Sequence, residues 1–210
     1  TNRKDLIRKL DTDHAECGGF QRGNPVYGPM VWLAPIFLGL IVAMPGNARM
    51  ADATATCDQA ARQAARHSIV PVDLLLAITR VETGRGTPSA PWPWTINSNG
   101  KGYWFQTRQE ALNFAQGELA AGRDTFDVGC FQMNLRWHSQ RFASLQDMLD
   151  PERNAKEAAL FLSELYETSG NWTDAAAAYH SRTPDLAQSY LRKIVGALND
   201  GPSESAVVTR

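Results

Sequence analysis

The segment ITRVETGRG (residues 78–86) ends an apolar helical run with a carboxylate, and two glycines follow close behind it. At 100° per residue, residues 73–83 place a continuous apolar arc on one side of a helix. Glu82 projects between Ile78 and Leu75, so it continues the apolar side. Because burial disfavours an ionised carboxylate, we expect the pKa of Glu82 to be raised.

A carboxyl group that keeps its proton near neutral pH is suited to acid catalysis of glycosidic bond cleavage. Gly84 and Gly86 let the chain turn away, which leaves the acid at a helix end with room in front of it. The alternative is that Glu82 turns to solvent or pairs with Arg85. This segment alone does not decide between the two.

The chain from about residue 56 onward carries further helix patterns, most of them with marked ends. Proline and acidic residues at helix starts, a capping box at Thr107 and Glu110, and glycines at helix ends set the boundaries. We expect helices at residues 57–67, 71–83, 107–122, 150–170, 171–180 and 183–198. PWPWTINSNGKGYWF (residues 91–105) contains an Asn-Gly turn between extended runs and predicts a small β-hairpin.

These patterns predict one mainly α domain over residues 54–198 with a β-hairpin excursion. The polar residues 199–210 are expected to form a disordered tail. Residues 1–53 are interpreted as a leader, because residues 31–44, VWLAPIFLGLIVAM, match the apolar region of a signal peptide. Small residues suit cleavage after Ala48, Ala53 or Ala55. We therefore expect export to the periplasm, with an uncleaved anchor or a buried core helix as alternatives.

Composition narrows the classes of function. The chain has 210 residues and a formal net charge of −1, so it lacks the basic field typical of nucleic-acid binding. No stretch has the Cys and His spacing of a metal site. Downstream of the leader remain Cys57 and Cys130, an even pair compatible with an oxidising compartment. Bonded, they would close a loop of about 74 residues, worth roughly 4 kcal/mol; two separate buried thiols are the alternative.

Three motifs follow one another in the order of a known family. VETG (residues 81–84), DVGCFQMN (127–134) and AAYHS (177–181) resemble those of the soluble-type lytic transglycosylases. Glu82-Thr83 matches a Glu-Ser step, residues 129–132 a Gly-Leu-Met-Gln step, and residues 178–180 an Ala-Tyr-Asn step. The Trp-Pro-Trp-Thr and Asp-Val-Gly-Cys forms are similar to an exported bacterial subgroup. The similarity covers about residues 56–196 and implies a mainly α, goose-type lysozyme-like fold.

The resemblance implies an activity on the glycan strands of peptidoglycan. Glu82 would protonate the bridging oxygen of the β-1,4 bond between N-acetylmuramic acid and N-acetylglucosamine. As a carboxylate it would then take the proton of the muramyl 6-hydroxyl, which closes a 1,6-anhydro ring without metal or cofactor. A hydrolytic muramidase and a non-catalytic wall-binding scaffold are the alternatives. A flagellar rod or secretion-machine protein is an expected delivery partner.

The resemblance also implies roles for further residues. Gln132 and Tyr179 would lie beside Glu82, and Thr83 belongs to the same motif. His180 replaces the usual Asn, and Cys130 replaces a common Leu, which suits a disulfide to Cys57. Aromatic residues that could line a saccharide cleft, or else belong to the core, are Phe131, Trp92, Trp94 and Trp104.

Two polar residues complete the set of candidates. Asn97 is expected to reach an acetamido group. For Asp127, holding the turn through backbone N–H groups is the preferred role, and a second catalytic role is the alternative.

Overall fold

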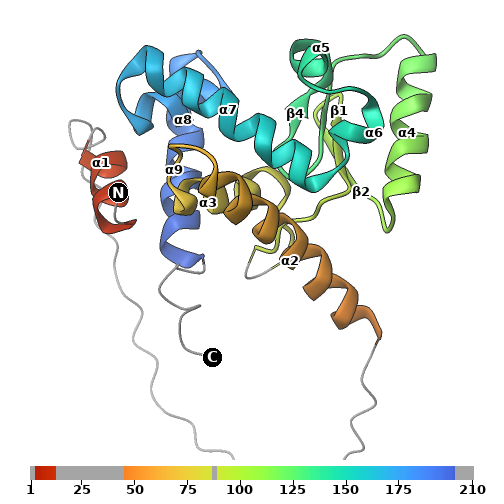
Figure 1. Ribbon diagram of the computed structural model, residues 1–210, viewed down its shortest axis with the longest axis horizontal. Helices are drawn as coiled ribbons and strands as arrows, with labels where there is room; N and C mark the ends of the chain where they lie inside the picture. The colour runs from red at the N-terminus through yellow and green to blue at the C-terminus, as the bar shows by residue number, and fades with distance from the viewer. Residues whose placement is uncertain (1–2, 13–44, 87–88, 202–210) are drawn as a thin grey trace, which may run out of the picture.

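The computed structural model describes residues 3–12, 45–86 and 89–201, and these are mainly helical with one small sheet (Figure 1). The longer helices are α1 (Arg3–Thr12), α2 (Pro45–Arg66), α3 (Val72–Thr83), α4 (Arg108–Ala120), α7 (Pro151–Ser169), α8 (Trp172–His180) and α9 (Pro184–Asp200). Short turns are α5 (Leu135–His138), η1 (Ser139–Arg141) and α6 (Leu145–Met148). The strands are β1 (Thr95–Ser98), β2 (Lys101–Trp104), β3 (Phe126–Val128) and β4 (Met133–Asn134).

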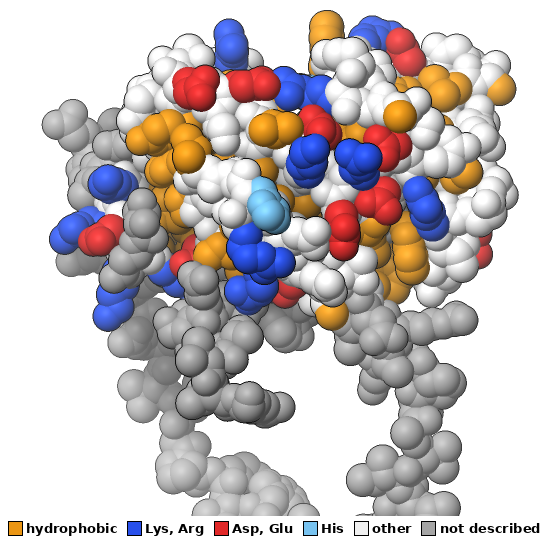
Figure 2. Space-filling view, viewed as in Figure 1, with side chains coloured by type: hydrophobic (Ala, Val, Ile, Leu, Met, Phe, Trp, Pro, Cys, Tyr) orange, Lys and Arg blue, Asp and Glu red, His pale blue; other side chains and the backbone are white. Residues whose placement is uncertain are grey.

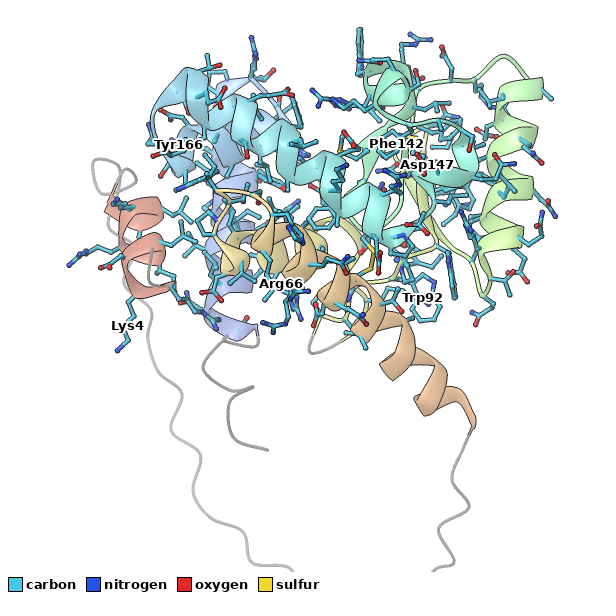
Figure 3. All side chains as sticks on the ribbon, in the orientation of Figure 1. Lys4, Arg66, Trp92, Phe142, Asp147 and Tyr166 are labelled. Carbon is cyan, nitrogen blue, oxygen red and sulfur yellow. A yellow bond between two sulfur atoms is a disulfide. The ribbon has the colours of Figure 1, made fainter. Side chains whose placement is uncertain are left out.

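Helix α3 is the centre of the helical part. It packs against α2 and α9, while α7 packs across α2 and α8. Seven consecutive residues of α3, from Leu74 to Arg80, are buried, because neighbours cover the helix on several sides. Figure 3 shows inward-pointing side chains filling the space between the helices. Most of the predicted apolar side is therefore buried, except that Val81 is half-buried, and Thr79 and Arg80 of the polar side are buried as well.

The helix ends follow the sequence signals. Thr107 Oγ1 accepts a hydrogen bond from the Glu110 N–H at 3.2 Å, which is one half of the predicted capping box. The Glu110 carboxylate accepts from the N–H of Gln106, one residue before the cap. Asp150 accepts from the N–H groups of Glu152 and Arg153 ahead of α7. Gly170 ends that helix with a φ of 77°, a left-handed conformation that glycine adopts without strain.

The sheet is antiparallel, with strand order β2-β1-β3-β4. The predicted hairpin is β1 and β2, which turn through Asn99 and Gly100, both with positive φ. Strands β3 and β4 were not expected. They include the two ends of the DVGCFQMN motif and have three and two residues, too few to show an alternating pattern.

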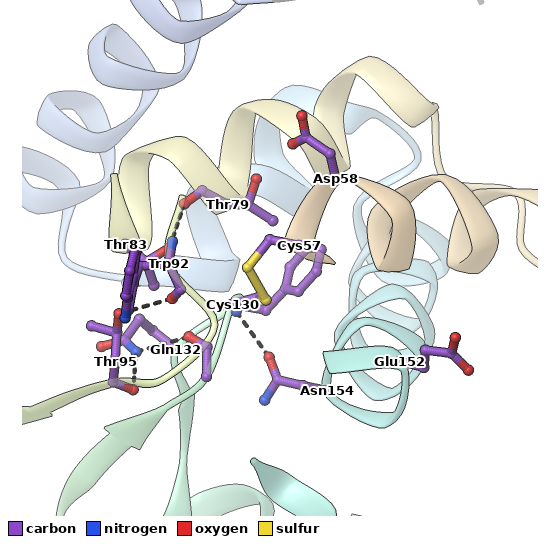
Figure 4. Close-up of a disulfide and its surroundings, with 12 residues drawn as sticks. Cys57, Asp58, Thr79, Thr83, Trp92, Thr95, Cys130, Gln132, Glu152 and Asn154 are labelled. Carbon is purple, nitrogen blue, oxygen red and sulfur yellow. Dashed lines mark hydrogen bonds between the residues drawn. A yellow bond between two sulfur atoms is a disulfide. The ribbon is translucent and has the colours of Figure 1, made fainter. Parts of the chain in front are cut away.

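One disulfide and one ion pair join α2 to its neighbours. Cys57 of α2 is bonded to Cys130, just after β3, which confirms the predicted disulfide (Figure 4). Arg80 of α3 donates to both carboxylate oxygens of Asp58 at 2.9 and 2.8 Å. The guanidinium is buried, so its paired, bidentate geometry offsets the cost of desolvation.

Helix α1 and the first turns of α2 fall within residues 1–53, the segment interpreted as a leader. Helix α1, within the predicted leader, packs against α8 and α9 and buries Leu6 and Leu10. Helix α2 begins at Pro45, upstream of the expected boundary at residue 53. Residues 31–44, and with them the predicted signal region, lie outside the described residues, as does the tail after residue 201.

The outer face over α7 and α2 carries Lys, Arg, Asp and Glu side chains that are interspersed rather than segregated by sign (Figure 2). In the part of the chain that the structure describes, no helix combines the length and apolar character needed to cross a membrane.

Candidate active site

A cavity of about 330 Å³ opens at the end of α3, between the sheet and helices α5, α7 and α8. Its walls differ in chemistry. The α3 and sheet side is mostly polar, with Glu82, Asn97, Asp127, Gln132, Met133 and Asn134. The helical side is aromatic, with Trp137, His138, Phe161, Tyr179 and His180. One polar and one aromatic wall suit a sugar ring, whose hydroxyl edges need hydrogen bonds and whose faces are apolar.

Glu82 occupies the last turn of α3 and lines this cavity. Its Oε1 accepts a hydrogen bond of 2.7 Å from the hydroxyl of Tyr190. Burial raises the pKa of Glu82 from 4.5 to about 7, and the negative charge of Asp127 adds to the rise. The Tyr190 hydrogen bond and the charge of Lys193 lower it in part. The carboxyl therefore keeps its proton up to about pH 7, and the raised pKa is the one expected from its place on the helix.

Arg85 does not compensate the charge of Glu82. Its guanidinium lies over the rings of Trp92 and Trp104, 5.7 and 5.4 Å from their centroids. The alternative in which Glu82 pairs with Arg85 is therefore wrong.

The chain leaves α3 through a close backbone approach at Gly84. A Cβ at this position would lie 2.2 Å from the Arg80 carbonyl oxygen and 1.8 Å from Ser89 Oγ, so only glycine fits. Thr83 is fully buried: its hydroxyl donates to the Thr79 carbonyl and accepts from the Trp92 N–H (Figure 4). Thr83 thus anchors the returning chain and does not line the cavity.

Tyr190 is a site residue that no motif indicated. It lies on α9 and is 2% exposed. Burial raises its pKa well above the ordinary value, so the phenol stays protonated and donates to Glu82. The ring stacks on His180 at 4.5 Å with an interplanar angle of 1°. A tyrosine within an apolar stripe was the available signal, because a buried phenol needs a polar partner.

Tyr179 lines the cavity as expected, but its hydroxyl is used elsewhere. It donates to the Phe131 carbonyl at 2.7 Å, so the hydrogen bond to Glu82 comes from α9 and not from α8. Burial, together with the charges of Glu82 and Asp127, raises the pKa of Tyr179. Its side chain holds the β3–β4 turn against α8.

Gln132 has a left-handed backbone, with a φ of 46°, which is uncommon outside glycine. Its side-chain Nε2 donates to the carbonyls of Thr95 and Gly129 at 3.1 and 2.9 Å (Figure 4). These two bonds hold the tight turn in place. Gln132 lines the cavity as predicted, with its amide nitrogen fixed by the turn.

Asn154 of α7 holds the same turn from the core side, and no sequence signal indicated it. Its Oδ1 accepts from the Phe131 N–H, and its Nδ2 donates to the carbonyls of Val128 and Met148. The Phe131 ring is fully buried, so it packs in the core. Of the two roles left open for Phe131, the structure therefore supports the core and not the cleft lining.

The tryptophans of the hairpin segment also lie outside the cavity lining. Trp92 is buried, with its Nε1 donating to the Phe105 carbonyl. Trp94 packs edge-on against Trp92 and on the core. Trp104 is 38% exposed and donates to the Thr83 carbonyl. The exposed aromatic at the cavity is instead Trp137, 67% exposed on α5.

Asp127 lines the cavity together with Asn97 and His180. Asn97 and His180 therefore lie where a ligand in the cavity would reach them, and contact with a saccharide stays a prediction. The carboxylate of Asp127 accepts from Asn134 Nδ2 at 2.8 Å, whereas the preferred expectation was bonding to backbone N–H groups. Burial raises the pKa of Asp127, and the Asn134 hydrogen bond lowers it in part.

Comparison with protein families agrees with this geometry. The family model described as the Transglycosylase SLT domain matches residues 59–193, which contain every residue that lines the cavity. Searches of curated proteins and of solved structures returned no match. The family match and the mainly α architecture confirm the predicted fold class.

Proposed function

The chain belongs to the Transglycosylase SLT domain family of lytic transglycosylases, and we propose that it cleaves the β-1,4 bond between N-acetylmuramic acid and N-acetylglucosamine in peptidoglycan. The observation that carries this proposal is a carboxyl group, Glu82, that faces the cavity with a pKa of about 7. The aromatic side of the cavity supports a saccharide ligand.

The proposed reaction uses Glu82 twice. The protonated carboxyl gives its proton to the bridging oxygen, and the bond from that oxygen to the muramyl C1 breaks. The resulting carboxylate takes the proton of the 6-hydroxyl, whose oxygen bonds to C1 and closes the 1,6-anhydro ring. Glu82 ends protonated, as it began. No water is consumed, because the 6-hydroxyl takes the place of water at C1.

The Tyr190 hydrogen bond supports this double role. It occupies Oε1 of Glu82, which leaves Oε2 to carry the proton. The Tyr190 hydroxyl also stabilises the carboxylate formed after the first proton transfer. Oε2, which gave up the proton, can then act as the base.

A test of the proposal is the Glu82→Gln variant, which keeps the size and the hydrogen-bond acceptor for Tyr190 but carries no acid proton. We expect it to bind peptidoglycan in a sedimentation assay and to release no soluble fragments. Release at the wild-type rate would contradict the assignment of Glu82. Loss of binding in the wild-type protein would contradict the assignment of peptidoglycan as ligand.

Hydrolysis is the alternative outcome, with water in place of the 6-hydroxyl. One observation favours it: a second carboxylate, Asp127, lies in the cavity, and most glycosidases that use water have two. The two outcomes differ by one water in the mass of the product.

We further propose that the protein acts in the periplasm, where peptidoglycan is found, and that a flagellar or secretion-machine protein delivers it. The Cys57–Cys130 disulfide supports an oxidising compartment. Thiol trapping of the protein from periplasmic and cytoplasmic fractions tests the location: the bonded form is expected in the periplasmic fraction alone.

A further inference from the structure

The sheet brings a row of three polar residues to the floor of the cavity. Asp127 of β3 lies directly opposite Asn97 of β1 on one side and Asn134 of β4 on the other. Residues that lie directly opposite in an antiparallel sheet share a face, and all three line the cavity. The strand neighbours of Asp127, Phe126 and Val128, are fully buried. The register therefore presents a carboxylate to the cavity and the apolar residues to the core.

We propose that Asp127 is a second catalytic residue, whose carboxylate stabilises the positive charge that develops on the muramyl ring while Glu82 protonates the leaving oxygen. This inference rests on the proposed function. The step is electrostatic: no bond forms to Asp127, and the proton movements are those of Glu82. A fixed negative group in a partly enclosed cavity stabilises a developing cation far more than it would in bulk water.

Asn134 supplies the local support that an ionised group needs in this position. Burial raises the pKa of Asp127, and Asn134 Nδ2, which donates to Asp127 Oδ1 at 2.8 Å, opposes this rise in part. The Oδ1 of Asn134 is buried, with no hydrogen-bond partner among the described residues. An unsatisfied buried oxygen costs free energy, so the orientation of this side chain serves the carboxylate.

The charged groups around the two carboxylates fix the expected pH behaviour. The cavity and its surroundings present Glu82 from α3, His138 from α5, Tyr179 and His180 from α8, and Tyr190 and Lys193 from α9. Burial lowers the pKa of both histidines, and both tyrosines stay protonated. Among these groups, the negative charge of Asp127 raises the pKa of Glu82, and the positive charge of Lys193 lowers it.

Activity requires Glu82 protonated and Asp127 ionised, so Glu82 sets the alkaline side of the pH–rate profile and Asp127 the acidic side. Replacing Asp127 by Asn removes a negative charge, which lowers the pKa of Glu82. Replacing Asn134 by Ala removes a donor to the carboxylate, which raises the pKa of Asp127. The two variants thus move opposite sides of the profile.

The experiment measures kcat, KM and their pH dependence on soluble glycan strands for the wild type, Asp127→Asn and Asn134→Ala. Asp185→Asn, an exposed aspartate at the start of α9, is the matched control and should behave as wild type. We expect Asp127→Asn to lose about 100-fold in kcat with a smaller change in KM, and its alkaline side to move to lower pH. In Asn134→Ala the acidic side should move to higher pH.

An Asp127→Asn variant with kcat within about threefold of wild type and an unmoved alkaline side would overturn the inference. Where circular dichroism shows that this variant does not fold, Asn134→Ala decides: an unmoved acidic side overturns the inference as well. A wild-type protein that releases no products would overturn the proposed function together with it. An active wild type with an unaffected Asp127→Asn variant would overturn only the role of Asp127.

Discussion

Burial of Glu82 lowers the free energy of unfolding near neutral pH, where the proposed reaction uses the acid form of this residue. Its pKa is raised from 4.5 to about 7 in the folded protein, with burial as the main cause. Between these values the folded protein keeps a proton that the unfolded chain has released. The free energy of unfolding therefore falls as pH rises through this window, by up to ~3 kcal/mol in all.

This linkage predicts that Glu82→Gln is more stable than wild type at high pH. The difference in unfolding free energy should be small at pH 4.5 and grow to ~3 kcal/mol by pH 8, because glutamine does not ionise. Urea unfolding of both proteins at several pH values measures it. A difference that stays constant over this range would show that Glu82 is not held protonated by burial.

Tyr190 is predicted to position the acid. Tyr190→Phe removes the donor to Glu82 Oε1 and keeps the ring that stacks on His180. Loss of one hydrogen bond should lower kcat about tenfold. Because this bond lowers the pKa of Glu82, the alkaline side of the pH–rate profile should move to higher pH.

The matched control is Tyr166→Phe, a tyrosine that stacks on Trp172 away from the cavity. It should match the wild-type profile. If Tyr190→Phe also matched it, the hydrogen bond would have no role in catalysis.

Single residues differ in how far the sequence predicts them. The position of Glu82 follows from the helical repeat of its own segment. The partnership with Tyr190 does not, because the two residues are 108 positions apart and depend on how α3 packs against α9. Phe131 shows the reverse case: its motif suggested a ligand contact, and the turn points its ring into the core.

At the level of elements, the turn between β3 and β4 depends on α7. Gly129 has a φ of 81°, and a Cβ there would lie 2.8 Å from the Asn154 side chain. Asn154 satisfies three backbone groups around this turn. Helix α7 therefore fixes the conformation of the segment that carries Asp127 and Gln132.

Replacing Asn154 by Ala should destabilise the protein by roughly 3 kcal/mol, because buried backbone groups lose their partners. Asn113→Ala, at an exposed position on α4, should change stability by less than about 0.5 kcal/mol. Thermal unfolding of both variants measures the difference. Equal midpoints would contradict the role of Asn154 in holding the turn.

Elements with local signals were predicted well. Capping residues, prolines and glycines marked the ends of α3, α4, α7, α8 and α9, and the Asn-Gly turn marked the hairpin. Strands β3 and β4 were not predicted, because such short strands are defined by their pairing and not by a repeating sequence pattern. Without them the sequence does not predict that Asp127 and Asn134 lie side by side.

At the scale of the whole molecule, the disulfide joins the helical part to the sheet. Cys57 and Cys130 are 73 positions apart, so the bond restricts a long loop in the unfolded chain. The double variant Cys57→Ser/Cys130→Ser should lose roughly 4 kcal/mol. Chemical denaturation measures this loss, and wild type under reducing conditions should show the same midpoint. A double variant with the midpoint of the oxidised wild type would contradict the stabilising role.

The sequence patterns predicted the order of most elements but not every packing surface. Helix α1 has ten residues and a strongly polar composition, so nothing local indicated that Leu6 and Leu10 would be buried against α8 and α9. The burial of Leu6 and Leu10 depends on the surface that α8 and α9 form together in the folded protein. The predicted signal region, at residues 31–44, remains a prediction.

In the proposed reaction, Glu82 acts first as an acid and then as a base within one muramyl unit. The most direct test is the mass of the soluble products released from purified peptidoglycan, with Glu82→Gln as the control. We expect wild-type products that lack one water relative to hydrolytic fragments, and no products from the variant. Wild-type products with the mass of hydrolytic fragments would show that Glu82 does not close the anhydro ring.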